Sequence, residues 1–262
     1  MFSCPRYLLD TVRRLMVRNG DLNLLGDYMV VGLGGGFNVL PDVLSDVEDV
    51  SGDAVTIKSY TGYFKGLRIS AIAMAGGPSY AEWAVALAYM RGVKALIGVG
   101  WCGALQENIR ISDAVIPIAS LRDEDTISHY VDPRFPAVAD PTLVSRAISI
   151  VSKHVERLGS RVWVGVTVSA SAMLAESLER VREWKKCRIL CVDEETSTIY
   201  TLSYLAGIPA LTLLAVSDNV ILGMDIASSK ELSDRVDNTY KELVKSALEI
   251  LVEVNRSSAK PS

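Results

Sequence analysis

Apolar runs of strand length alternate along this chain with longer segments that have helical periodicity. Such alternation is typical of strand–helix–strand units, in which parallel strands are buried on both faces by helices. Of the 262 residues, 49% are hydrophobic and 22% are charged, which is enough apolar material for one large core. The pattern therefore predicts an α/β fold, and we expect residues 1–262 to form a single domain.

Individual elements can be placed from the same pattern. The segments expected to be strands are 28–33, 54–60, 67–73, 95–99, 113–119, 162–168, 188–192 and 210–216. Helices are expected over 80–90, over 141–158 behind an Asp140 cap, and after Ser228 or Ser229 near the end of the chain. Eight strands exceed a small open sheet, so we expect a central sheet with a bent or barrel-like edge between layers of helices.

Charge and hydropathy exclude several classes of partner. The net charge is −4 and no basic stripe is present, so no nucleic acid is expected to bind. The longest apolar run, 205–216, is shorter than the roughly 18 to 20 residues that span a bilayer and contains Gly207 and Pro209, so no membrane partner is expected. Because the N-terminal segment has no continuous apolar stretch, we expect a cytoplasmic protein. The four cysteines match no strong metal-binding pattern, so no metal is expected.

Glycine-rich segments follow three of the expected strands. They are Gly32–Gly36, Ala75–Ser79 and Gly98–Ala104. Backbone N–H groups in such loops can approach an anion closely, but the first segment completes neither the dinucleotide nor the Walker fingerprint. A tight turn that packs sheet against helix is an equal alternative for it. Loops at the ends of neighbouring strands nevertheless predict one shared crevice.

Two acidic segments also follow apolar strands. Asp193, Glu194 and Glu195 stand where a strand passes into a helix, so they either cap that helix or present a carboxylate to the vicinal hydroxyls of a sugar. Asp218 lies between Ser217 and Asn219 after a very apolar strand. It is either an Asx-turn or cap residue, or an acid whose pKa is raised so that it donates a proton.

Taken in order, these segments resemble the nucleoside phosphorylase family, which includes the hexameric purine nucleoside phosphorylases, the uridine phosphorylases and the methylthioadenosine nucleosidases. The matching pieces are Gly34, Ala75–Ser79, Gly98–Ala104, Ile111–Val115, Phe135–Asp140, Val192–Thr196 and Ser217–Asn219. The order and spacing of the seven pieces are more specific than any one of them. The resemblance implies a three-layer α/β/α sandwich with a mixed, partly barrel-like central sheet.

The resemblance further implies cleavage of the bond between a nucleobase and C1′ of ribose, most simply by phosphate, with no cofactor. Position by position, the implied catalytic residues are Asp218 at the purine base and Glu195 at the ribose hydroxyls. The implied ribose site is Glu194, Glu195 and Met173, and the implied base site is Cys102, Gly103, Ser217 and Asp218, with Asn219 also orienting the acid. The implied phosphate or nucleophile pocket is Gly34, Gly35, Asn38, Gly98 and Trp101. Family members form dimers or hexamers, so a homo-oligomer is expected.

The sequence departs from the family at the phosphate pocket. Asn38 and Gly98 stand where phosphorylases usually have arginines, and Trp101 stands where they have a hydroxyl residue. Three functions therefore stay open. A divergent purine nucleoside phosphorylase would use Arg68 or an arginine from a neighbouring subunit, a nucleosidase would use water, and a nucleoside-binding protein would have no turnover. Uridine specificity is less favoured, because Ser177 and Glu179 replace the uracil-binding glutamine and arginine.

Overall fold

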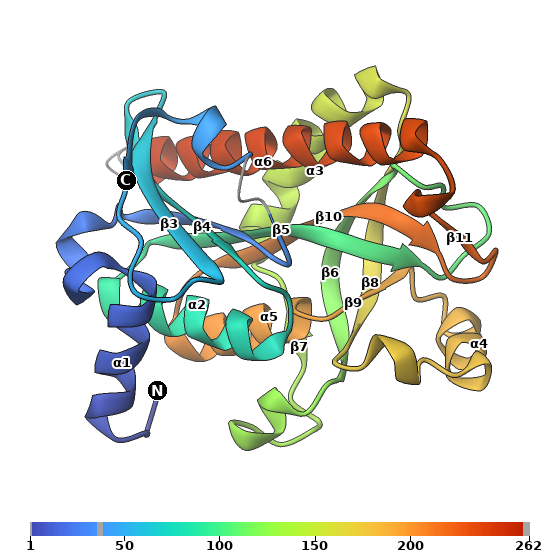
Figure 1. Ribbon diagram of the computed structural model, residues 1–262. Coiled ribbons are helices and arrows are strands. Elements are labelled where there is room, and N and C mark those ends of the chain that lie inside the picture. The colour runs from blue at the N-terminus through green and yellow to red at the C-terminus, as the bar shows by residue number, and fades with distance from the viewer. Residues whose placement is uncertain (1, 36–38, 259–262) are drawn as a thin grey trace.

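The computed structural model describes residues 2–35 and 39–258 (Figure 1). The strands are β1 (Tyr28–Gly32), β2 (Ser45–Asp49), β3 (Ile57–Phe64), β4 (Leu67–Met74), β5 (Ala95–Ala104), β6 (Ala114–Asp123), β7 (Ala137–Val138), β8 (Val162–Ala170), β9 (Cys191–Asp193), β10 (Ala210–Asn219) and β11 (Met224–Asp225). The α-helices are α1 (Arg6–Met16), α2 (Pro78–Arg91), α3 (Pro141–Val155), α4 (Leu178–Lys186), α5 (Thr196–Ala206) and α6 (Lys230–Ser258).

The strands of the described residues form one mixed sheet that closes on itself at one end. β10 pairs in parallel with β5 and antiparallel with β6, β6 pairs with β8, β8 pairs with β9, and β9 returns to β5. On the other side of β5 the sheet continues through β1, β4, β3 and β2 as an open extension. The closed part is the barrel-like region that the sequence predicts.

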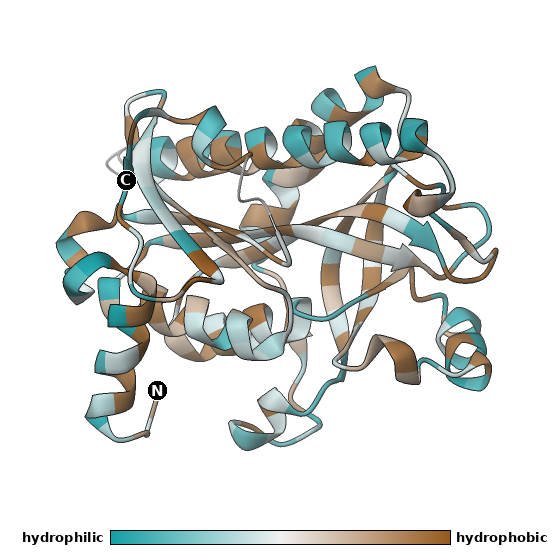
Figure 2. Ribbon diagram, in the orientation of Figure 1, coloured by the Kyte–Doolittle hydropathy of each residue, from teal (hydrophilic) through white to brown (hydrophobic). Residues whose placement is uncertain are grey.

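Helices cover the sheet on two sides. In Figure 1, α6 and α3 lie together along one side, whereas α2 and α5 lie on the opposite side. The face of α6 that points to the sheet is apolar and its outer face is polar (Figure 2). Leu243, Ala247, Ile250 and Leu251 are all fully buried on that inner face. The expected α/β/α arrangement with a mixed, partly barrel-like sheet is therefore confirmed.

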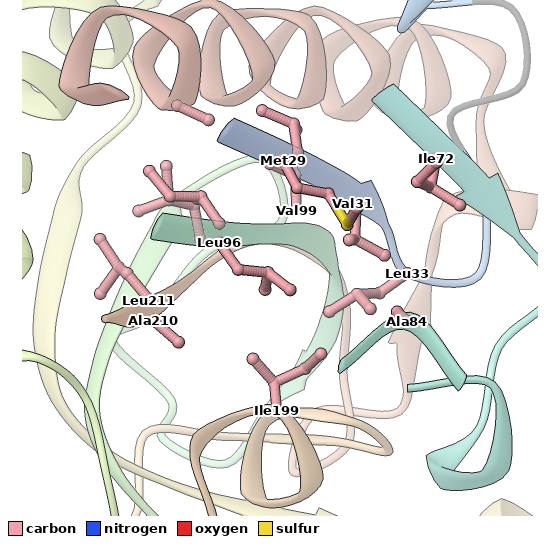
Figure 3. Packing of buried hydrophobic residues seen from close by; sticks show 14 of the residues in the cluster. Met29, Val31, Leu33, Ile72, Ala84, Leu96, Val99, Ile199, Ala210 and Leu211 are labelled. Atoms are coloured by element: carbon pink, nitrogen blue, oxygen red, sulfur yellow. The ribbon is translucent and has the colours of Figure 1, made fainter. Parts of the chain in front are cut away.

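The main core lies between the helices and strands β1, β5 and β10. Met29 and Val31 of β1, Leu96 and Val99 of β5, and Ile199 of α5 converge there (Figure 3). All five are fully buried, and burying such a side chain contributes about 1.5–3 kcal/mol. This packing holds the carboxyl ends of β1 and β5 in place, where the glycine segments are located.

Local capping follows the sequence. The Asp140 carboxylate accepts hydrogen bonds from the backbone N–H groups of Thr142 and Leu143, at 2.9 and 3.0 Å, and begins α3. Gly92 ends α2 with φ of 74°, in the left-handed region that favours glycine. α3 is shorter than predicted, because residues 156–158 form a separate 3-10 turn.

The strand predictions differ from the structure in several places, and the strand expected over 188–192 is observed as β9 at Cys191–Asp193. Residues 98–104 are not a loop, because β5 continues through them to Ala104. Glycines suit this stretch because neighbours occupy the space where side chains would stand: a Cβ at Gly98 would lie 2.9 Å from Leu33 Cδ1. Strand β2 was not predicted, because all five of its residues are exposed and it has no buried apolar alternation.

Within residues 2–35 and 39–258, no helix combines the length and apolar character needed to cross a membrane.

Candidate active site

A cavity of about 230 Å³ opens at the carboxyl ends of β5, β9 and β10. The predicted site residues that line it are Gly34, Trp101, Cys102, Gly103, Met173, Glu194, Glu195, Ser217 and Asp218. They come from segments more than 180 residues apart in the chain, and the pairing of β5 with both β9 and β10 brings them together. Glu195 and Asp218 thus share one cavity.

The three consecutive acids that begin at the last residue of β9 fall into the two predicted roles. Asp193 is buried and caps α5, because its carboxylate accepts hydrogen bonds from the Thr196 N–H and the Ser169 hydroxyl, both at 2.8 Å. Glu195 instead turns into the cavity, where its Oε1 accepts a hydrogen bond from the Gly77 N–H at 2.5 Å. Glu194 also lines the cavity and is half-buried.

The Gly77 hydrogen bond explains the glycine segment that follows β4. A Cβ at Gly76 would lie 3.1 Å from Glu195 Oε1, and Gly77 has φ of 110°. Residues 75–77 thus pass close to the carboxylate and hold it by a backbone donor. Burial, and next the negative charge of Asp193, raise the pKa of Glu195 to about 8.

Asp218 approaches the cavity from β10, just after a bulge between Val216 and Asp218. Its Oδ1 accepts a hydrogen bond from the Ser217 hydroxyl at 2.8 Å. Burial raises the pKa of the Asp218 carboxyl, whereas the Ser217 hydrogen bond opposes that shift. Asn219 does not orient Asp218, contrary to expectation. Its side-chain amide donates to the carbonyls of Gln106 and Ile109 and holds that turn.

Trp101 occupies the predicted phosphate end of the cavity. Its indole stacks on Tyr240 of α6, with ring centroids 4.7 Å apart and an angle of 18° between the rings. The indole also lies against Gly34 and Gly35, where any side chain at Gly35 would collide with it. The backbone of the first glycine segment therefore faces an aromatic ring at this point.

The other predicted phosphate residues lie elsewhere. Gly98 does not line the cavity, because Leu33 and Thr212 fill the space beside it. Gly35 contacts Trp101 but is not part of the cavity lining. Asn38 lies outside the described residues. Arg68 stands at the far end of β4 from Gly76, and its guanidinium donates to the backbone carbonyls of residues 23–25.

Two residues between β8 and α4 complete the cavity. Met173, predicted for the ribose, is exposed at its rim. Glu176, which sequence reasoning missed, is half-buried in the lining. Burial, followed by the charges of Asp218 and Glu194, raises the pKa of Glu176 to about 7. No local signal marks Glu176, because it lies in an irregular stretch with no strand end or motif beside it.

The cavity is strongly acidic. Its carboxyl groups are those of Asp193, Glu194, Glu195, Asp218 and Glu176, and none of the described lining residues is a lysine or arginine. No group of three or more His, Cys, Asp or Glu in the described part of the chain is arranged to hold a metal ion. Such a cavity favours hydroxyl and N–H donors over anions.

The family model described as "Phosphorylase superfamily" matches residues 29–256. The chain belongs to this superfamily. Among relatives within it, the purine nucleoside phosphorylases (DeoD-type) of Caldanaerobacter subterraneus subsp. tengcongensis and of Alkaliphilus metalliredigens are each 33% identical over 193 residues. Each of these matches covers 73% of this chain and 79% of the relative. The family resemblance predicted from the sequence is therefore confirmed.

Solved structures of the superfamily have the same fold. A uridine phosphorylase from Vibrio fischeri superposes with a TM-score of 0.80 at 22% identity, covering 89% of this chain and 95% of that chain. A purine nucleoside phosphorylase from Toxoplasma gondii, in complex with immucillin-H, superposes with a TM-score of 0.77 at 18% identity, covering 90% and 94%. At these identities the structures show the shared fold.

Proposed function

We propose that the protein cleaves the C1′–N bond of purine nucleosides, with inorganic phosphate as acceptor, to give free base and ribose 1-phosphate. The observation that carries the proposal is that Glu195 and Asp218 face one cavity. The named activity of the relatives at 33% identity supports phosphate as the acceptor. No cofactor takes part in this reaction.

The two carboxyl groups suit the charge changes of this reaction. As the bond breaks, the ribose becomes cationic and the base gains electron density, so groups that match these charges favour the transition state over the substrate. Glu195 accepts hydrogen bonds from the 2′ and 3′ hydroxyls, most strongly in its ionised form, which becomes the major form above about pH 8. Asp218, protonated, gives its proton to N7 of the base, while a phosphate oxygen forms the new bond to C1′. Burial raises the pKa of Asp218, and this keeps more of the carboxyl in its donating form.

Other parts of the cavity fit a nucleoside in the same orientation. Cys102 and Gly103 of β5 lie beside Asp218 and would contact the base, with Ser217 holding the acid. Glu194 lies next to Glu195 and would face the ribose, and Met173 would cover it from the rim.

Hydrolysis is the second candidate, and Trp101 is the observation that favours it. Its indole lies against Gly34 and Gly35, where phosphate would bind, and offers a single N–H donor. The described lining also lacks the cations that normally bind phosphate. Water carries no charge and meets no such repulsion.

The deciding experiment supplies inosine, adenosine, guanosine and uridine, each with and without phosphate, and identifies the sugar product. We expect purine release that requires phosphate and yields ribose 1-phosphate. Release of free ribose at a rate independent of phosphate would establish hydrolysis instead. Release of base from uridine alone would contradict the purine assignment. If no nucleoside is cleaved, the remaining function is that of a nucleoside-binding protein without turnover.

Two variants at Trp101 sharpen this experiment. Trp101→Ser removes the ring and supplies a hydroxyl, so for a phosphorylase we expect KM for phosphate to fall. Trp101→Phe keeps an aromatic ring against Tyr240 and serves as the matched control, with KM for phosphate close to that of the parent. If the ring blocks phosphate completely, only Trp101→Ser will produce ribose 1-phosphate.

We further infer a cytoplasmic homo-oligomer, built from dimers and up to a hexamer. Apolar side chains exposed on the paired strands β6 and β8 support it, namely Ile118, Leu121, Val164 and Val166. Exposed apolar side chains that gather on a protein surface are typical of interfaces. Light scattering of the purified protein tests this, and a monomer at micromolar concentration would contradict it.

A further inference from the structure

Glu176 occupies a defined position in the cavity although its segment is irregular. It follows the 3-10 turn Met173–Ala175 and donates its backbone N–H to the Met173 carbonyl at 3.3 Å. The next residue, Ser177, begins α4 by accepting a hydrogen bond from the Arg180 N–H. Both sides of Glu176 are therefore anchored, and its side chain lines the cavity together with Asp218 and Glu194.

The Glu176 carboxylate has no hydrogen bond or ion pair with any of the described residues. The positive charge of Arg180 lowers the pKa of Glu176, but the Arg180 guanidinium forms no hydrogen bond with it. It is paired instead with Asp123, with Nε 2.7 Å from Oδ2. Asp193 has Ser169 and Thr196 as partners, Glu195 has Gly77, and Asp218 has Ser217. Glu194 is also half-buried without a hydrogen bond among the described residues, but it lies next to Glu195 and is assigned to the ribose in the proposed function.

A half-buried carboxylate without a donor is costly, because water solvates it only in part and no protein group replaces that water. The cost is removed when a bound ligand supplies an N–H or O–H donor. The 2′ and 3′ hydroxyls are already bound by Glu195 in the proposed function. The donors that remain on a nucleoside are the 5′-hydroxyl and the N–H groups of the base, and Glu176 shares the cavity lining with Asp218, the acid placed at the base.

We propose that Glu176 is a specificity-determining residue that accepts a hydrogen bond from the amino group of a 6-aminopurine. This inference rests on the proposed function. With Asp218 at N7, the neighbouring substituent on the same edge of a purine is the one at C6, and Glu176 lies in the same cavity as Asp218. A 6-oxo group there would direct a lone pair at the carboxylate, whereas a 6-amino group would direct a hydrogen at it.

The charge state of Glu176 gives the inference a second signature. Burial and the neighbouring charges of Asp218 and Glu194 raise the pKa of Glu176 to about 7, and Arg180 opposes that shift. Above this pH the carboxylate only accepts and disfavours 6-oxopurines. Below it the carboxyl carries a proton that it can donate to a 6-oxo group. The adenosine-to-inosine preference is therefore expected to rise with pH between about 6 and 8.

The test compares kcat/KM for adenosine and inosine in the parent, Glu176→Gln and Glu176→Ala. We expect the parent to prefer adenosine, and the ratio to fall by about tenfold or more in both variants, because an unpaired polar group discriminates strongly. In both variants the adenosine-to-inosine ratio should no longer depend on pH, because the titrating carboxyl group is absent. Glu179→Gln, an exposed neighbour outside the cavity, is the matched control and should leave the ratio unchanged.

Calorimetric titration with adenosine and inosine separates this inference from the proposed function. An adenosine preference in binding that Glu176→Gln removes supports the inference even if no base is released. Cleavage with an adenosine-to-inosine ratio near one, or a ratio that both variants leave unchanged, would overturn the inference while the proposed function stands. If neither nucleoside binds to the parent, both are wrong.

Discussion

The carboxylate of Asp218 lies directly over the backbone of Gly103, and an added Cβ at Gly103 would come within 2.7 Å of Asp218 Oδ2. These two residues are cross-strand partners at the end of the β5–β10 pairing, just past the bulge in β10. Glycine at position 103 is thus what allows Asp218 to reach the cavity. The position of the Asp218 carboxylate therefore depends on the residue at position 103.

Gly103→Ala is therefore expected to move the Asp218 side chain without unfolding the protein. A displacement of about 1 Å at a reacting group costs on the order of 10²-fold in rate. We expect kcat for purine nucleosides to fall by about that factor, with KM changed much less, as measured by steady-state base release. A loss of activity that is accompanied by a clear fall in Tm would instead point to a folding defect.

Asp218→Asn is expected to lower turnover by about 10² to 10⁴, because an amide cannot transfer a proton to the base. A purine nucleoside methylated at N7 carries a positive charge already and needs no such proton. We expect the variant to cleave that substrate nearly as well as the parent does. Equal losses on both substrates would show that Asp218 acts by some means other than proton donation.

Glu195→Gln is expected to weaken nucleoside binding and the transition state, because a neutral amide accepts sugar hydroxyl protons less strongly. In the parent, KM should fall as pH rises through about 8, where Glu195 ionises. Glu194→Gln, at the more exposed neighbour, should have the smaller effect. Steady-state kinetics against pH provide the measurement.

Glu195→Gln, which is expected to weaken binding and catalysis, is expected to increase the stability of the folded protein. The pKa of Glu195 in the folded chain is raised from 4.5 to about 8, so native stability declines as pH rises between these values. Glutamine removes that cost. We expect Glu195→Gln to increase Tm by at least about 2 °C at pH 8 and to change it little at pH 5. A lower Tm at pH 8 would contradict a raised pKa.

For Glu242 on α6 the expected dependence of stability on pH is the opposite, because its ionised form stabilises the folded protein. It contacts the buried His154, with Oε2 2.9 Å from Nδ1, and it also pairs with Arg157 and Lys245. Burial opposes ionisation, but hydrogen bonds from Lys245 and His154 lower the pKa of Glu242 overall. Its stabilisation is therefore present above about pH 4.5 and is lost as pH falls through the lowered pKa.

We accordingly expect Glu242→Gln to reduce the free energy of unfolding by roughly 1–3 kcal/mol at pH 7, with a smaller difference at pH 3.5. The matched control is Glu253→Gln on the same helix, whose ion pair with Arg146 is half exposed. Its effect should stay below about 0.5 kcal/mol. Urea unfolding at the two pH values measures all three proteins. A pH-independent loss for Glu242→Gln would contradict the linkage.

Much of this fold follows from local sequence. The strand and helix alternation, the Asp140 cap and the helix over 80–90 depend on neighbours within a few residues, so they are predicted correctly. The order of short motifs also identifies the family. The exposed strand β2 and the continuation of β5 through its glycines are missed, because their pairing partners, and not their own side chains, hold them in the sheet.

The sequence by itself determined the family, the α/β framework and the pair of acids, Glu195 and Asp218, most suited to the chemistry. Only the tertiary structure decided which of the acids 193–195 caps a helix, that Trp101 lies on Tyr240 at the end of the cavity predicted for phosphate, and that Glu176 enters the cavity without a hydrogen-bond partner among the described residues. The physical reason is that periodicity and capping report interactions over a few residues. Burial, stacking and unpaired charge arise between segments that only the closed sheet brings together.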